Sequence, residues 1–169
     1  MVLPTGGGKT FTAIRFLCAG PLAQGYKVLW LAHTHHLLEQ AFKELGPQDE
    51  SQRSAVGHIP EPRETLRVRV VSGTEGHYRV AGIDPADDVV IATLQTICKA
   101  FSDQTRGDGH PNLMRFLDSC EGKLCVVFDE AHHAPAPSYR RFIEKLRLRY
   151  SKLCLLGLTA TPTYTDQRK

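Results

Sequence analysis

A glycine-rich stretch near the amino terminus has the composition of a phosphate-binding loop. Residues 3–10 read LPTGGGKT, which fits the pattern G-x-x-x-x-G-K-[ST] except that Leu3 replaces the first glycine. Glycines lack a Cβ, so the backbone N–H groups can face a polyphosphate. A helix that begins at about Lys9 adds its positive dipole end. The predicted phosphate-binding residues are Thr5, Gly6, Gly7, Gly8, Lys9 and Thr10.

Two of these side chains have further chemistry. The Lys9 amine can reach the β- and γ-phosphates of a nucleotide, and the Thr10 hydroxyl can ligate Mg²⁺. The alternative interpretation is a flexible glycine turn that happens to precede a lysine and a threonine.

A pair of acids follows an apolar run about 120 residues later. In the sequence DEAH, Asp129 is placed to hold Mg²⁺ opposite Thr10, and Glu130 to act as the general base that activates water. The alternative is a polar turn after a strand. His132 and His133 follow, and each is either a relay between the nucleotide and another site or a structural histidine.

A hydroxyl-rich segment, Thr159-Ala160-Thr161-Pro162, follows the last apolar run. The hydroxyls of Thr159 and Thr161 can form hydrogen bonds toward the γ-phosphate or toward the acidic pair. The alternative is a hydroxyl-rich cap that leads into a loop.

The elements that must position these residues alternate along the chain. Apolar runs predict strands at residues 28–32, 66–71, 89–92, 124–128 and 153–158. Helical spacing of apolar residues and the segments between these runs predict helices at 9–18, 33–45, 94–101, 112–119 and 139–150. Strands that alternate with helices form a parallel α/β sheet, whose ligands lie at the carboxyl ends of the strands. Residues 47–65 are polar and are expected to form a surface insertion.

Composition limits the class of protein. The 169 residues, 41% of them hydrophobic and 23% charged, predict one globular domain over residues 1–169. A net charge of +3 permits a polyanionic partner without requiring one. Five scattered cysteines indicate reduced thiols in a cytoplasmic protein. No apolar run approaches the ~20 residues that span a bilayer, so no membrane partner is expected.

Five motifs in this order resemble a known family: LPTGGGKT, WLAHTHHLLEQ, VIATLQT, FDEAHH and GLTATP. The series resembles the first motor domain of superfamily 2 DEAD/DEAH-box helicases, and most closely the subgroup with the type III restriction enzyme Res subunits. The resemblance implies a RecA-like P-loop NTPase fold, with a mostly parallel sheet flanked by helices. It also implies hydrolysis of ATP with Mg²⁺, coupled to movement on nucleic acid, with DNA favoured over RNA.

The resemblance carries over to individual residues. It assigns phosphate binding to the glycine-rich loop with Lys9, the metal and base roles to Asp129 and Glu130, and the third catalytic position to His132. Thr159 and Thr161 match a motif that couples hydrolysis to strand movement. The residues that match segments lining the nucleic-acid face are Ala32, His33, Gln40, Thr93, Gln95 and Thr96.

The family motor has two RecA-like domains, and this chain is expected to contain only the first, with a clipped first strand. We therefore expect the isolated chain to hydrolyse ATP slowly at best, because the arginine finger of a second domain is worth a factor of about 10³–10⁵ in related NTPases. The main prediction is the ATP-binding half of a helicase or translocase. Two alternatives are the motor part of a restriction endonuclease and a non-catalytic nucleotide-binding fragment.

Overall fold

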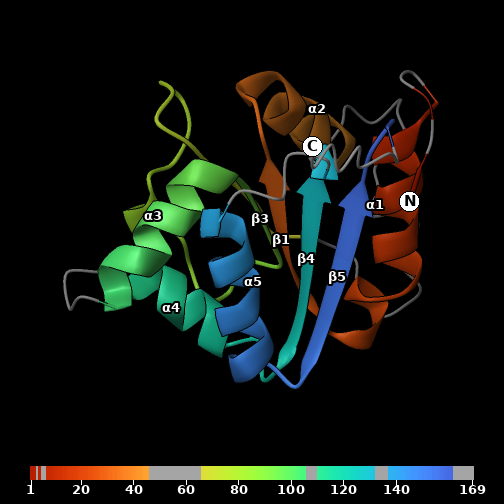
Figure 1. Ribbon diagram of the computed structural model, residues 1–169. Coiled ribbons are helices and arrows are strands. Elements are labelled where there is room, and N and C mark those ends of the chain that lie inside the picture. Colours follow the sequence, from red (N-terminus) through yellow and green to blue (C-terminus); the bar gives the residue numbers. More distant parts are fainter. Residues whose placement is uncertain (3, 5–6, 46–65, 106–109, 132–136, 162–169) are drawn as a thin grey trace, which may run out of the picture.

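A five-stranded sheet forms the centre of the molecule (Figure 1). The computed structural model describes residues 1–2, 4, 7–45, 66–105, 110–131 and 137–161. The strands are β1 (Lys27–Ala32), β2 (Val68–Val71), β3 (Val89–Thr93), β4 (Lys123–Asp129) and β5 (Lys152–Leu158). The α-helices are α1 (Lys9–Ala19), α2 (His35–Leu45), α3 (Leu94–Thr105), α4 (Pro111–Asp118) and α5 (Pro137–Arg149). Short 3₁₀ helices lie at η1 (Leu22–Gln24) and η3 (Val80–Gly82).

Every strand pair in the sheet is parallel, and the strand order is β2-β3-β1-β4-β5. The central strand β1 pairs with β3 on one side and with β4 on the other. Its continuous apolar run from Val28 to Ala32 is buried throughout, as expected for a strand covered on both faces. The predicted parallel α/β architecture is confirmed.

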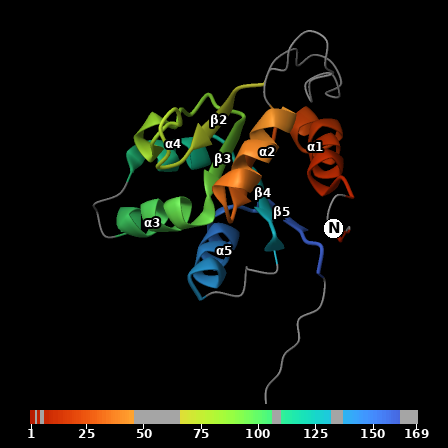
Figure 2. The same cartoon turned by 90° about the horizontal axis from the view of Figure 1, so that it is seen from above.

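Helices cover both faces of this sheet (Figures 1 and 2). Side chains alternate between the faces along each strand, so Leu29 and Leu31 of β1 pack with α3, α4 and α5. Val28 and Trp30 point the other way and pack with α1 and α2. The sheet therefore separates two apolar cores, one under each layer of helices.

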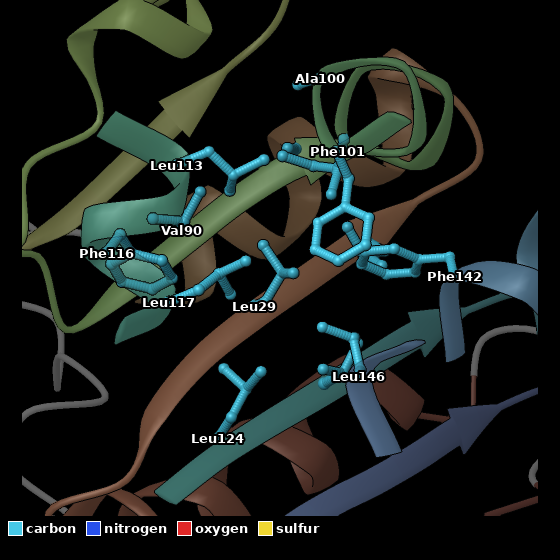
Figure 3. Packing of buried hydrophobic residues seen from close by; sticks show 14 of the residues in the cluster. Leu29, Val90, Ala100, Phe101, Leu113, Phe116, Leu117, Leu124, Phe142 and Leu146 are labelled. Carbon is cyan, nitrogen blue, oxygen red and sulfur yellow. The ribbon is translucent and has the colours of Figure 1, made fainter. Parts of the chain in front are cut away.

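The core on the α3–α5 side contains most of the aromatic packing (Figure 3). Phe101 of α3 and Phe142 of α5 meet edge to face, with ring centroids 5.1 Å apart. Leu146 lies one turn further along α5 and is also fully buried. The apolar stripe that predicted a helix near residues 139–150 is the buried face of α5.

Several helix boundaries differ from those expected by one to four residues, and those of the second and third helices have a physical reason. The second helix begins at His35 rather than His33, because Thr34 acts as its N-cap: the Leu37 N–H donates to Thr34 Oγ1 over 3.4 Å. The third helix continues past Phe101 to Thr105, so apolar spacing underestimated its length. The insertion predicted for residues 47–65 lies outside the described residues.

The first residues of the chain lie beside the end of β5. Val2 forms a parallel bridge with Thr159. The terminal amine of Met1 donates to the Gly157 carbonyl over 2.8 Å, and the Thr159 N–H donates to the Met1 carbonyl over 3.2 Å. This pairing brings the glycine-rich loop that follows to the carboxyl edge of the sheet. Within the described residues, every helix is too short or too polar to cross a bilayer.

Candidate nucleotide site

A cavity of about 210 Å³ opens where β4 ends and α1 begins. Because all five strands are parallel, their carboxyl ends share one edge of the sheet, and the chain reaches that edge again at the start of α1. The cavity is lined by Gly8, Lys9, Thr10, Phe11, Leu37, Gln40, Glu44, Asp129 and Glu130. Residues about 120 positions apart in the sequence therefore share one site.

The described part of the glycine-rich loop is a tight turn. The Gly7 N–H donates to the Pro4 carbonyl over 2.9 Å, and a Cβ on Gly7 would lie 2.9 Å from the same oxygen. Gly8 has a φ of 73°, in the left-handed region, and its carbonyl accepts the first helical hydrogen bond of α1 from Thr12. Both positions require glycine, one for space and one for conformation. Thr5 and Gly6 lie outside the described residues.

Lys9 and Glu130 face each other across the cavity. The Lys9 amine lies 3.5 Å from Oε1 of Glu130, and the two side chains are only 11% and 23% exposed. An ammonium group this close to the cavity attracts anions, and the amino-terminal end of α1 adds to that attraction.

Asp129 is the last residue of β4 and is 5% exposed. Burial, and secondly the negative charge of Glu130, raise the pKa of its carboxyl to about 6. The Glu130 N–H, the Lys9 amine and the Trp30 indole lower this pKa without offsetting burial. Oδ1 accepts the Glu130 N–H over 3.1 Å, whereas Oδ2 is buried with no hydrogen bond among the described residues. The indole N–H of Trp30 likewise has no hydrogen bond among the described residues.

The oxygen atoms at this site fit the ligands that a magnesium ion requires. Mg²⁺ prefers oxygen ligands, above all carboxylates, and usually keeps several waters. Oδ2 of Asp129 is a buried oxygen without a partner in the described structure, and the buried Thr10 hydroxyl lines the same cavity. A cation there would offset the unfavourable burial of the Asp129 charge.

Glu130 adopts an unusual backbone conformation. Its φ is 55°, a left-handed value that costs roughly 1–2 kcal/mol for a residue with a Cβ. The turn changes the direction of the chain after β4 while Asp129 and Glu130 both line the cavity. Ala131 then lies so close to β5 that a Cβ on Gly157 would be 3.1 Å from the Ala131 Cβ. Backbone strain of this kind is common at functional sites.

Comparison with known proteins identifies the family. A sequence model of the family described as "Type III restriction enzyme, res subunit" matches residues 1–164. The chain belongs to this family. No curated protein matches the chain.

Solved structures share the fold of this chain. The helicase domain of Hef from Pyrococcus furiosus is 24% identical with a TM-score of 0.54; the match covers 98% of this chain and 30% of that one. A Dbp5 variant from S. cerevisiae, solved with RNA and ADP BeF3, is 14% identical with a TM-score of 0.55; the match covers 96% and 36%. The chain thus spans about a third of these relatives. The RecA-like fold and the main prediction, an ATP-binding, helicase-like motor domain, are confirmed.

Thr159 and Thr161, which follow β5, form hydrogen bonds with each other. Oγ1 of Thr159 donates to the Thr161 carbonyl over 3.1 Å and accepts the Thr161 N–H over 3.1 Å. Neither residue lines the cavity. His132 lies outside the described residues.

The residues expected on the nucleic-acid face lie in different places. Gln40 lines the nucleotide cavity, and His33 is half-buried between β1 and α2. Thr93 is buried at the end of β3, where its hydroxyl lies 2.7 Å from that of Thr96 and accepts the Thr96 N–H over 3.3 Å. Gln95 is exposed at the start of α3. Their roles toward nucleic acid stay predictions.

Three cavity residues were not predicted from the sequence: Phe11, Leu37 and Glu44. Leu37 and Glu44 flank Gln40 at positions i, i+3 and i+7 of α2, which is the spacing of one helix face. That spacing was available in the sequence, but nothing in it indicated which face of α2 would meet the cavity.

Proposed function

We propose that the chain is the ATP-binding domain of a nucleic-acid-dependent ATPase, which hydrolyses ATP with Mg²⁺ to move on nucleic acid. The observation that carries this proposal is the convergence of Lys9, Thr10, Asp129 and Glu130 on one cavity. A glycine turn, a helix amino terminus and a lysine together bind a polyphosphate, and two carboxylates supply a metal ligand and a base.

In this proposal the loop N–H groups and Lys9 hold the β- and γ-phosphates. Thr10 and Asp129 are the residues that would hold magnesium, which when bound neutralises charge on the phosphate oxygens. Glu130 accepts the proton of the attacking water. Lys9 would exchange its contact with Glu130 for a contact with phosphate when the nucleotide binds.

The remaining roles extend this proposal along the chain. Thr5, Gly6 and His132 keep the phosphate and catalytic roles that the family motif implies. Thr159 and Thr161 would couple hydrolysis to movement. His33, Gln40, Thr93, Gln95 and Thr96 are the candidate strand contacts.

The partners are also proposals. Membership of the res-subunit family favours DNA over RNA as the nucleic acid and implies a second RecA-like domain in the complete motor. Movement on duplex DNA without strand separation, as the motor of a restriction endonuclease, is the second candidate that the family favours. All five cysteines are free thiols, which favours a reducing, cytoplasmic location.

The test separates binding from hydrolysis. A fluorescent ADP with Mg²⁺ should bind the wild-type chain and Glu130→Gln alike, but not Lys9→Ala. Phosphate release stimulated by single-stranded DNA should fall at least about 10²-fold in Glu130→Gln, the lower range for loss of a general base. Lys152→Ala removes an exposed lysine outside the cavity and serves as the matched control. Equal nucleotide affinity in wild type and Lys9→Ala would contradict the proposed site.

A further inference from the structure

A chain of hydrogen bonds joins α2 to the loop that follows β2. Nε2 of His77 lies 2.6 Å from Oε1 of Glu39 on α2, and Nδ1 of His77 lies 2.7 Å from the Ser72 hydroxyl. The Ser72 oxygen also accepts the Thr74 N–H over 3.1 Å. A second contact links the same elements, because Thr74 Oγ1 lies 3.1 Å from Nδ1 of His35.

The chemistry of the side chains determines which group donates in each of these hydrogen bonds. An ionised carboxylate only accepts hydrogen bonds, so Nε2 of His77 must carry a hydrogen and donate it in the hydrogen bond to Glu39. In the neutral imidazole, Nδ1 is then an acceptor, and the Ser72 hydroxyl donates to it. Ser72 is 3% exposed and the His77 side chain 15%. The bond between Ser72 and His77 therefore lies in little water and is costly to break, whereas the bond to Glu39 involves a charged group on a side chain that is 42% exposed.

The loop itself is held against the sheet. The Ser72 N–H donates to the Tyr78 carbonyl and the Tyr78 N–H to the Val70 carbonyl, each over 3.0 Å. Val71 and Tyr78 also form a parallel bridge. The backbone from Ser72 to Tyr78 is therefore folded back on β2.

The two ends of this series of hydrogen bonds, Glu39 and Ser72, lie near different cavities. On α2, Gln40 follows Glu39 directly and lines the nucleotide cavity with Leu37 and Glu44. At the other end, Ser72 lines a second cavity of about 330 Å³. The residues around the second cavity are Ser72, Gly73, Arg79, Val80, Thr96, Lys99, Ala100 and His110.

The second cavity has the chemistry of an anion site. Arg79 and Lys99 are basic side chains, and Thr96 and His110 add polar groups; no acidic side chain is among the lining residues described. Such a set suits a phosphodiester of a nucleic-acid backbone. The hydrogen bonds of His77 thus connect α2, at the residue next to Gln40 of the nucleotide cavity, with Ser72 in the wall of a cationic cavity.

We propose that His77 is a positioning residue that couples nucleotide in the first cavity to a nucleic-acid phosphodiester in the second. The inference rests on the proposed function and adds the route by which one ligand alters the affinity of the other. A ligand that shifts α2 moves Glu39, and through His77 it moves Ser72 and the loop. By linkage, each ligand then changes the affinity of the other by the same factor.

The test measures that factor with the purified chain. The dissociation constant of fluorescent ADP with Mg²⁺ is determined with and without a saturating single-stranded oligothymidylate, and the converse titration is done with labelled oligothymidylate. In the wild type the two ratios should agree and lie in the usual range of about 5- to 150-fold. In His77→Phe, which keeps a ring but loses both hydrogen bonds, both ratios should approach one while the affinity for ADP alone is unchanged. His77→Gln, which keeps a donor for Glu39, should restore part of the coupling.

Control variants separate coupling from folding. Asp118→Asn removes a different short ion pair, with Arg149 at 2.6 Å, and should keep the wild-type ratio. If His77→Phe melts below the assay temperature, Glu39→Ala replaces it, because that side chain is 42% exposed. Wild-type coupling in both variants would overturn the inference, as would independent binding of the two ligands to the wild type. Failure of the wild type to bind ADP at all would instead overturn the proposed function.

Discussion

At the scale of single residues, the site holds groups in states that they would not adopt in water. Burial raises the pKa of Asp129 to about 6, and Glu130 has a left-handed backbone. Each feature destabilises the empty protein and suits a bound cation or nucleotide. Lys9 and Glu130 form an ion pair that any phosphate at Lys9 must displace.

Asp129 should make the apo protein less stable as pH rises. Its pKa is 3.8 in the unfolded reference and about 6 when folded, so the folded state holds the proton more tightly. Stability is full below the unfolded value and is lost as pH rises through about 6, by at most roughly 3 kcal/mol. Asp129→Asn should therefore match the wild type near pH 4 and exceed it above pH 6.

Urea unfolding in EDTA across that pH range measures the difference. Asp118→Asn is the control, because its carboxylate is exposed and its ion pair with Arg149 is worth at most about 1 kcal/mol. A stability difference between Asp129→Asn and the wild type that does not vary with pH would contradict the assigned burial effect.

At the scale of elements, the turn before α1 is where the backbone is most constrained. Gly7 has no room for a Cβ beside the Pro4 carbonyl, and Gly8 has a positive φ with no described atom within 4 Å of its Cβ position. The two glycines are therefore required for different reasons. On α2, one helix presents Gln40 to the nucleotide cavity and Glu39 to His77.

Alanine at either loop glycine should weaken nucleotide binding. A left-handed residue with a Cβ costs about 1–2 kcal/mol, and a loop without nucleotide can relax to avoid this cost, so Gly8→Ala should lose up to about thirtyfold in affinity for Mg·ADP. Gly7→Ala should also lose affinity, because the turn must move away from the Pro4 oxygen. Gly73→Ala is the matched control, since no described atom lies within 4 Å of a Cβ there. If all three variants bound Mg·ADP with the affinity of the wild type, the loop geometry would not matter for binding.

At the scale of the whole molecule, one sheet joins two cores. Leu29 packs on the α3–α5 side, and the neighbouring Trp30 packs under α1 and α2. Both lie on the central strand, so loss of packing on one face should loosen the other. The sheet also holds the nucleotide cavity, because its carboxyl edge carries Asp129.

Leu29→Ala should lower the free energy of unfolding by about 2–5 kcal/mol, the usual range for a buried leucine. Trp30 is the only tryptophan in the chain, so its fluorescence reports on the opposite face. Fluorescence and far-UV circular dichroism should show the same shifted transition in urea. Leu148→Ala is the control, since Leu148 is 89% exposed, and it should change little. A Trp30 transition unmoved by Leu29→Ala would show that the two faces unfold separately.

The sequence by itself determined the elements and the chemistry of the site. Continuous apolar runs predicted β1, β3 and β4 because strands buried on both faces need apolar residues at every position. The edge strand β5 has a similar apolar run, although most of its residues are only half-buried. The glycine-rich loop and the Asp129-Glu130 pair were recognisable because their chemistry depends on residue type and short spacing. The boundaries of α2 and α3 were less certain, since capping by Thr34 and packing beyond Phe101 compete with apolar spacing.

Only the tertiary structure decided which segments meet. The strand order, the Gln40 face of α2 in the nucleotide cavity, and the contacts of His77 with Glu39 and Ser72 all join residues distant in the sequence. The raised pKa of Asp129 depends on what surrounds its carboxyl. Local patterns cannot encode these features, because burial and contact arise only when the helices pack onto the sheet.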